Sequence, residues 1–178
     1  LMSLMIVLQQ EIVKFNRLLG TMSVSLIDLQ KAIEGLIVMS SDLDKCYTCF
    51  MNNALPPVWE RDSFASMKTL GSWNKDLIFR VDFMEHWLVH GQPAFFPLNL
   101  FFFPQGFMTG AMQTFARKYQ VPVNKLAFGF EVLPADTVLE DMPEPDDGVV
   151  CNGIFLEAAR WDPEACELVD SKLGEIYT

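Results

Sequence analysis

The stretch FFFPQGFMTG, residues 101–110, sets three consecutive phenylalanines against a proline and follows them with two glycines. Pro104 has a fixed φ and no backbone N–H, so it is suited to the first turn of a helix, where that N–H would lack an intrahelical partner. We expect the helix to occupy residues 105–118. This stretch therefore predicts a corner of the polypeptide that leads into a helix.

A buried structural role for this corner is favoured over two other roles. The apolar run between Pro97 and Pro104 is six residues long, far short of the roughly twenty that a membrane-spanning helix needs. The stretch has no general base or phosphate-binding lysine, and the hydroxyl of Thr109 alone is a poor nucleophile. We expect the phenylalanines to fill the space between helices, and Gly106 and Gly110 to let a neighbouring element approach closely.

The composition argues against a nucleic-acid-binding protein. The 178 residues include 23 acidic and 13 basic ones, a formal net charge of −10, and no cluster of Lys and Arg that could neutralise phosphates. A hydrophobic share of 51% indicates either an apolar surface that faces a partner or a piece of a larger protein. The first residues, LMSLMIVLQQE, read as the middle of a helix. They favour a fragment of a soluble intracellular protein without a membrane span.

Four further helices are expected before the corner. Apolar residues recur at helical spacing over 3–18, and Gly20 should end this helix. A second helix over 21–39 should then lie antiparallel to the first, because the connection is so short. Serine and aspartate caps predict a third helix within 40–51, and a fourth is expected over 72–90. The inner stripe of the fourth helix is expected to consist of Leu77, Ile78, Val81, Met84 and Leu88.

The pattern changes to that of strands after the last helix. Large apolar residues alternate with small or charged ones over 126–132, which is typical of a strand with one buried face. An acidic, proline-rich connection follows over 134–147, and strand character returns over 149–160. Within that segment Asn152 and Gly153 predict either a tight hairpin turn or, as we prefer, a bulge in one long strand.

These elements predict an α+β fold. Residues 1–120 should form a bundle of about five helices, and residues 121–178 a small antiparallel β element. The β element is expected to be incomplete, because two or three strands do not make a stable sheet without further partners.

Two pairs of residues have spacings that metal sites use. Cys46 and Cys49 form a CxxC motif, but no second pair at matching spacing accompanies them, and reduced thiols on a helix are the simpler interpretation. His86 and His90 stand four apart on a predicted helix, without the glutamate that follows the first histidine of a zinc-protease helix. A rival hypothesis is therefore a free-standing scaffold or binding module that holds a metal through one of these pairs.

Enzymatic motifs are missing from the sequence. It contains no GxxxxGK[ST] phosphate loop, no GxGxxG and no GxSxG elbow, so we expect no autonomous enzyme and no cofactor in this segment. Arg160 invites two interpretations. As a functional residue it would bind an anion; as a structural residue, which we favour, it would pair with a nearby carboxylate and stack on an aromatic ring.

Five motifs in unbroken order carry a resemblance to a known family. The sequence resembles the C-terminal domain of dynein heavy chains, in particular the axonemal ones, from about residue 9 to about residue 170. The PQG form is more similar to inner-arm than to outer-arm dyneins. The motifs are QQEIVKFNRLL (9–19), SLIDLQKAIEGLIVMS (25–40), LPPVWE (55–60), FFFPQGFMTGAMQTFARKY (101–119) and DGVVCNGIFLEAARWD (147–162).

The resemblance implies a non-catalytic domain that follows the sixth AAA+ module of a motor ring, with a helical part and then a small β barrel. In such proteins ATP and magnesium belong to other modules and microtubules bind a separate stalk. The implied partners are the ring modules of the same heavy chain and other dynein subunits, in the axoneme of cilia or flagella. If the apolar helical stripes dock on the ring, the isolated segment should expose an apolar patch and self-associate.

Two departures from the family pattern concern the backbone rather than the domain assignment. Pro97, Leu98, Asn99 and Leu100 stand where the family often has Trp-Leu-Ser-Gly, and Ala158 stands where it often has glycine. The residues that the resemblance assigns to a structural motif, with no catalytic, cofactor or metal role, are Phe101, Phe102, Phe103, Pro104, Gln105, Gly106, Gly110, Arg117, Gly153, Glu157, Arg160 and Trp161.

Overall fold

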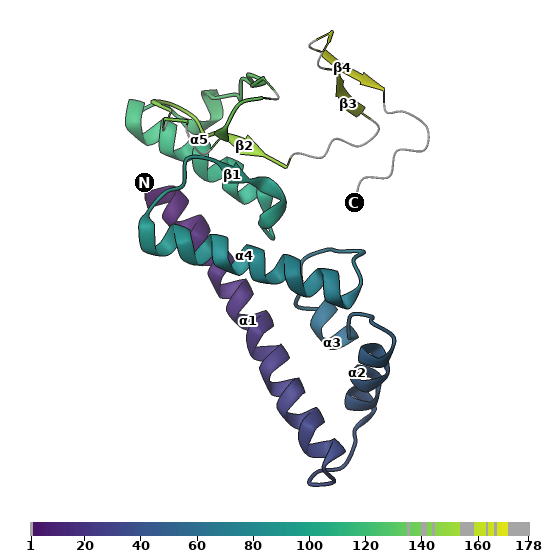
Figure 1. The fold of residues 1–178 in the computed structure, drawn as a ribbon. Helices are drawn as coiled ribbons and strands as arrows, with labels where there is room; N and C mark the ends of the chain where they lie inside the picture. Colours follow the sequence, from purple (N-terminus) through teal and green to yellow (C-terminus); the bar gives the residue numbers. More distant parts are fainter. Residues whose placement is uncertain are drawn as a thin grey trace.

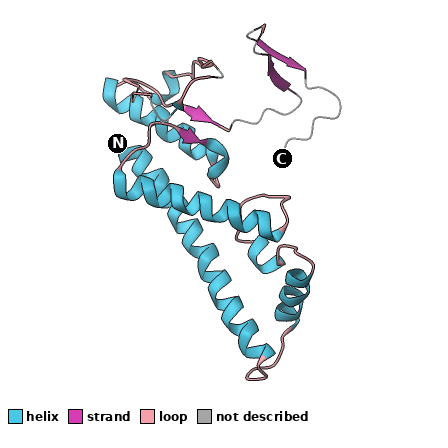
Figure 2. Cartoon of the chain, viewed as in Figure 1, coloured by secondary structure: helices cyan, strands magenta, loops and turns pink. Residues whose placement is uncertain are grey.

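The computed structural model of the protein describes residues 2–134, 136–139, 142–143, 145–153, 159–162, 164–165 and 167–170. The helices are α1 (Met2–Ile33), α2 (Ser41–Met51), α3 (Pro57–Glu60), α4 (Leu70–His90) and α5 (Pro104–Tyr119), with short 3-10 helices η1 (Leu98–Leu100) and η2 (Val123–Lys125). The strands are β1 (Phe96–Pro97), β2 (Cys151–Asn152), β3 (Ala159–Asp162) and β4 (Glu167–Asp170). Helices dominate and the sheets are small and unclosed, so the predicted α+β class is confirmed (Figure 2).

The long helix α1 organises the helical part. It is the longest helix of the described residues; α4 crosses it, α5 lies near its N-terminal end, and α2 and α3 lie beside its C-terminal half (Figure 1). Each of these four helices contacts α1. The fold therefore depends on which residues of α1 face inward along its whole length.

The prediction that Gly20 ends the first helix is wrong, because α1 continues without a break from Met2 to Ile33. A glycine inside a helix costs about 1 kcal/mol relative to alanine, which weakens a helix without ending it. The inward stripe continues past the glycine, with Leu18 at 0% and Leu29 at 5% exposure. Burial of this stripe outweighs the local preference of one residue, so the two predicted antiparallel helices are one.

The true end of α1 is set by a second glycine. Gly35 has a φ of +75°, and the N–H groups of Gly35 and Leu36 donate to the carbonyls of Ala32 (3.1 Å) and Lys31 (2.8 Å). This pair of bonds is the Schellman motif, in which a left-handed residue satisfies the last carbonyls of a helix. The positive φ favours glycine, so position 35 ends the helix where position 20 does not.

The predicted helices α2, α4 and α5 are confirmed, with one correction to the inner face of α4. Ser40 caps α2 by accepting the N–H of Leu43 at 3.3 Å. Ile78 and Leu88, predicted to point inward, are 54% and 56% exposed. The buried face consists instead of Trp73, Leu77, Arg80, Met84 and Trp87.

The core lies where α1, α4 and α5 meet. Trp73, Leu18 and Phe107 are each 0% exposed, and the indole N–H of Trp73 donates to Ser63 Oγ at 3.0 Å. A buried indole needs such a partner, since an unpaired N–H in the core is destabilising. Large aromatic side chains thus fill the core, and the indole N–H of Trp73 has a hydrogen-bond partner there.

The predicted strand over 126–132 is not formed. The alternating pattern does give two faces, but a strand also needs a neighbour that pairs with its N–H and C=O groups. No strand of the described residues pairs with this segment, and Phe128 and Phe130 are 40% and 76% exposed. The periodicity alone was therefore not enough to predict a paired strand.

Strand pairing joins distant parts of the sequence. β1 pairs in parallel with β2, with Phe96 opposite Cys151, and β3 pairs antiparallel with β4. Asn152 lies within β2 and is not among the described residues with positive φ, so the hairpin turn considered at Asn152–Gly153 is absent. The alternative of one long strand extends into 154–158, which lie outside the described residues. The parallel pair was not expected, because its first strand lies before the last helix.

Candidate functional site

The corner at residues 101–110 is where the apolar core comes closest to a set of polar contacts. Phe101 is 4% exposed and its ring stacks on that of Phe107, with centroids 4.8 Å apart. The ring of Phe102 meets that of Phe15 edge-on at 4.8 Å. Phe103 differs, being 52% exposed. Two of the three phenylalanines therefore fill the space between helices, and the third faces outward at the start of α5.

A buried carboxylate from α1 caps this corner. Glu11 is 2% exposed, and its Oε2 and Oε1 atoms accept the backbone N–H groups of Phe102 at 2.7 Å and Phe103 at 3.2 Å. Phe103 is the N-cap residue of α5, and its apolar side chain accepts no hydrogen bond from the first turn of the helix. Pro104, the first residue of the helix, has no N–H. A negative charge is also stabilised near a helix N-terminus by the helix dipole. Glu11 thus holds, from α1, the backbone of the two residues that lead into α5.

The surroundings of Glu11 compensate its charge. Lys14 Nζ lies 4.0 Å from Glu11 Oε1, and it also lies over the rings of Phe102 and Phe103, at 5.5 and 5.7 Å from their centroids. A buried ion is tolerated only when hydrogen bonds and opposite charge replace its hydration. We call this arrangement of Glu11, Lys14 and the Phe102–Phe103 backbone the Glu11 cap.

Sequence reasoning missed the Glu11 cap, although a signal was present. Position 11 lies in the middle of the inward stripe of α1, between Leu8 at 1% and Phe15 at 3% exposure. A charged residue in such a stripe is buried only when it is paired. The lone carboxylate among apolar neighbours therefore indicated a specific partner, but its partner atoms are backbone N–H groups more than ninety positions away.

Gly110 allows α5 to lie directly on α1. A Cβ atom placed there would lie 2.9 Å from Cγ2 of Val7, closer than carbon atoms approach in folded proteins. At Gly106 the nearest atom would be Cδ1 of Phe103, at 2.6 Å. Gly110 thus brings the two helices together, while Gly106 accommodates the ring of Phe103.

A second polar cluster fixes α3 and the turn after it to α1. Asp62 accepts from Thr21 Oγ1 at 2.8 Å and pairs with Arg17 Nη2 at 2.8 Å, and the indole N–H of Trp59 donates to Ser25 Oγ at 2.8 Å. Hydrogen bonds from Arg61 and then Thr21 hold the pKa of Asp62 below its usual value. The carboxylate form of Asp62 is thus the one that this packing favours.

We expect Asp62→Asn to flatten the acid dependence of stability. Because the pKa of Asp62 is lowered on folding, its contribution is present above the unfolded value of about 3.9 and is lost as pH falls through the folded value. The variant should therefore be less stable than the parent at neutral pH, and the difference should shrink below about pH 4. Denaturation between pH 2 and pH 7 measures this.

Asp28→Asn is the matched control, since Asp28 lies on α1, which Asp62 contacts, and has no ion-pair partner among the described residues. An equal difference between parent and Asp62→Asn at all pH values would contradict the role assigned to Asp62.

An arginine that is buried, paired and stacked does occur, but at Arg80 rather than at Arg160. Arg80 Nη2 lies 3.1 Å from Asp76 Oδ2, and its guanidinium carbon lies 3.7 Å from the centroid of Phe64. Arg160 Nη2 lies 3.4 Å from Asp162 Oδ2, and over no aromatic ring among the described residues. The carboxylate partner predicted for Arg160 is therefore found, and the ring is not.

The remaining predicted motif residues are dispersed. Gln105 lies in the first turn of α5 and Arg117 in its last turn, where a cation is favourable to the helix dipole. Gly153 has a φ of +69° and lies against the side group of Asn99, and Trp161 lies in β3 at 38% exposure. Glu157 is outside the described residues. A structural role for this whole set stays a prediction.

The two candidate metal pairs lie on different helices. Cys46 is buried in α2, and burial, followed by the nearby Cys49 and Asp42, raises the pKa of its thiol. The rings of His86 and His90 lie 4.5 Å apart on α4. Across the residues with described positions, no group of three or more His, Cys, Asp or Glu residues is arranged to hold a metal ion.

Burial also affects Cys151, in β2. It raises the pKa of this thiol to about 11. Because the thiolate is the nucleophilic and metal-binding form, this thiol is a poor candidate for either role at neutral pH.

The sequence matches known proteins along its whole length. Residues 1–178 match the family described as the C-terminal domain of the dynein heavy chain. They are 40% identical over 193 residues to dynein axonemal heavy chain 6 of Homo sapiens, an alignment that spans 98% of this protein and 5% of the relative. The identity is 43% to dynein axonemal heavy chain 1 of Homo sapiens (97% and 4% spanned) and 45% to dynein axonemal heavy chain 12 of Mus musculus (88% and 5%).

The matched segment thus spans only 4–5% of the length of these relatives. Within the described residues, no helix is both long and apolar enough to cross a membrane.

Proposed function

Because residues 1–178 belong to the family of C-terminal domains of dynein heavy chains, we propose that they form the non-catalytic structural and regulatory domain of an axonemal dynein heavy chain. In this proposal the domain packs on the AAA+ ring of its own heavy chain and supports ATP-driven, microtubule-based movement of cilia or flagella. The family match and the axonemal relatives support this assignment.

One observation carries the proposed contact with the ring, namely an apolar row on the outer side of α1. Ile6, Val13, Val24 and Ile27 are 48%, 61%, 61% and 49% exposed. Their spacings of 7, 11 and 3 residues place them on one side of a helix, opposite the inward stripe that contains Glu11. We call these four residues the α1 ridge.

The exposed apolar side chains of the α1 ridge suit a surface that packs against another part of a protein. The four branched side chains are exposed on one side of α1, with Gln10 and Arg17 among the residues between them, and apolar side chains exposed together on one side of a helix indicate an interaction surface. The relatives extend far beyond the matched segment, since the match spans 4–5% of their length, so the rest of the same heavy chain is the partner present in every molecule. The Glu11 cap and Gly110 hold α1 against α5, which makes the ridge a rigid surface.

The chemistry of the motor is assigned in this proposal to other parts of the heavy chain. The sequence has no phosphate loop, so ATP and magnesium would bind to AAA+ modules outside this segment, and microtubules and other dynein subunits would bind elsewhere as well. Residues 1–178 by themselves should neither bind nor hydrolyse ATP. Hydrolysis by the purified segment would overturn the proposed non-catalytic role.

The proposal is tested by replacing ridge residues in the full-length heavy chain. Ile6→Gln together with Val13→Gln makes the ridge polar, so docking should weaken. We expect a several-fold change in microtubule-stimulated ATP hydrolysis and in gliding velocity. Val38→Gln is the control, since Val38 is 90% exposed and lies outside α1. Unchanged hydrolysis and gliding in the ridge variant would contradict the proposal.

A further inference from the structure

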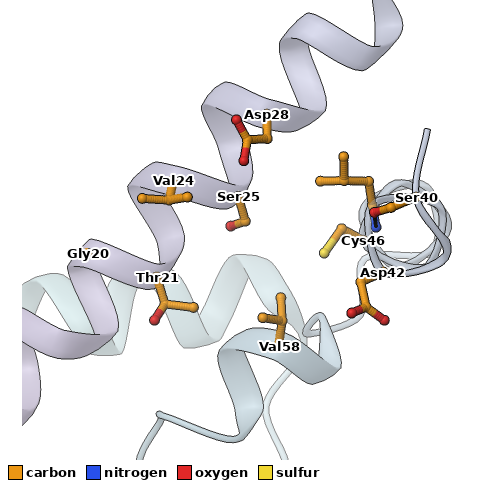
Figure 3. Close-up of a pocket in the computed structure, with 10 residues that line it drawn as sticks. Gly20, Thr21, Val24, Ser25, Asp28, Ser40, Asp42, Cys46 and Val58 are labelled. Carbon is orange, nitrogen blue, oxygen red and sulfur yellow. Dashed lines mark hydrogen bonds between the residues drawn. The ribbon is translucent and has the colours of Figure 1, made fainter. Parts of the chain in front are cut away.

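An open groove of about 510 Å³ lies between α1, α2 and α3. Its α1 wall includes Val24 and Asp28, its α2 wall includes Asp42 and Leu43, and Val58 of α3 lies at its base (Figure 3). The groove therefore combines an apolar lining with one carboxylate on each of two facing helices. We call it the α1–α2 groove.

The two carboxylates are available to a partner. Asp28 has no ion-pair partner among the described residues. Asp42 Oδ1 lies 3.7 Å from Lys45 Nζ, with the two side groups 82% and 61% exposed, and such an exposed pair contributes little and exchanges readily. The walls of the groove thus carry one carboxylate without an ion-pair partner among the described residues and one in an exposed pair with Lys45.

The shape and charge of the groove fit one kind of residue. Lysine and arginine have an apolar stem and a cationic tip, so the stem can lie on the valine and leucine side groups while the tip meets a carboxylate. An acidic residue in the groove would be repelled by the two carboxylates, and an apolar residue would leave them without a charged partner.

The groove is continuous with the α1 ridge through Val24, which belongs to both. We propose that the α1–α2 groove receives a lysine or arginine from a segment of the same heavy chain outside residues 1–178. This inference rests on the proposed function, because the segment that covers the ridge is the one that reaches the groove. In this proposal the α1 ridge supplies the apolar part of the contact, and the groove adds an ion pair to it.

Gly20 leaves room at the edge of the groove. A Cβ atom at this position would meet no atom within 4 Å, and Gly20 lines the groove. A larger residue introduced here would occupy the space of the incoming group without disturbing the fold. Gly20→Leu is therefore a second variant that opposes docking by a route independent of charge.

The experiment is hydroxyl-radical footprinting of the purified full-length heavy chain, read by mass spectrometry at Val24 and Leu43 in the groove and at Ile6 and Val13 on the ridge. In the parent, we expect all four to react several-fold more slowly than in the denatured protein. Asp28→Asn with Asp42→Asn should raise the reactivity of Val24 and Leu43 several-fold.

Gly20→Leu should raise the reactivity of Leu43 in the same way. Asp44→Asn is the matched control and should change nothing, because Asp44 is an exposed acid in the first turn of α2 that does not line the groove.

Each result has a distinct meaning. If ridge and groove both react freely in the parent, the proposed docking on the ring fails and the inference fails with it. If the ridge is protected and the groove reacts freely, the inference alone is overturned. If the groove is protected but the Asp28→Asn, Asp42→Asn variant leaves that protection intact, its occupant is not basic and the inference is again overturned.

Discussion

Glu11→Ala is expected to lower the free energy of unfolding by about 3 kcal/mol, because it removes two part-buried hydrogen bonds from backbone N–H groups to a charged carboxylate, each of which contributes about 1.5–3 kcal/mol. These are the groups of Phe102 and Phe103, now bonded at 2.7 and 3.2 Å. The loss should concentrate at Phe102 and Phe103, immediately before α5, because Glu11 accepts the N–H groups of both. Chemical denaturation measures the total, and hydrogen exchange of the Phe102 and Phe103 amides measures the local part.

Two variants separate the role of Glu11 from a general effect of removing a glutamate. Glu11→Gln keeps one acceptor oxygen but sets an NH2 group against a backbone donor, so it should recover only part of the loss. Glu85→Ala removes an exposed glutamate from α4 and should change stability by less than about 0.5 kcal/mol. If Glu11→Ala were as mild as Glu85→Ala, the Glu11 cap would not hold the corner together.

Gly110→Leu is expected to destabilise the protein by about 3 kcal/mol, because overpacking a filled contact forces neighbouring groups and backbone to shift. The first added carbon would already lie 2.9 Å from Val7 Cγ2, and the next nearest atoms belong to Leu4 and Ser3. α5 would have to move away from α1, and the Phe101–Phe107 stack and the Glu11 cap would move with it. Equilibrium denaturation of the variant measures the effect.

The same substitution at Gly20 is the matched control and should have the opposite sign. Both glycines lie inside helices, so both gain helix propensity of about 0.8 kcal/mol when leucine replaces glycine. Only Gly110 faces a neighbour, since a Cβ at Gly20 meets nothing within 4 Å. Equal destabilisation at both positions would mean that the loss comes from something other than contact between α1 and α5.

Local signals predicted the elements that local chemistry decides. Pro104 at the first position of α5 and Ser40 as the cap of α2 act through their own backbone neighbours, and both lie where the sequence predicted them. Gly20 misled the prediction because the burial of Leu18 and Leu29 on either side outweighs one unfavourable residue. The end of α1 near Gly35 was missed as well, because the predicted second helix ran to residue 39 whereas α1 ends at Ile33, so neither glycine was assigned its actual role from the sequence.

Contacts between residues far apart in the sequence could not be predicted from local sequence patterns. The alternation over 126–132 says nothing about which strand offers hydrogen bonds. The pairing of Phe96 with Cys151 spans the last helix, so no local pattern encodes it. The Glu11 cap could be predicted in part. The burial of a lone glutamate in an apolar stripe was foreseeable, but its backbone partners follow only from the packing of α5 on α1.

The central claim is that α1 is a two-sided helix, with the Glu11 cap facing the core and the α1 ridge facing the rest of the heavy chain. A cryo-EM structure of the full-length heavy chain that resolves the side groups of Ile6, Val13 and Ile27 tests it most directly. We predict that these three residues are buried against AAA+ modules of the same heavy chain. A structure in which the same three residues face solvent while the ring is fully assembled would contradict the claim.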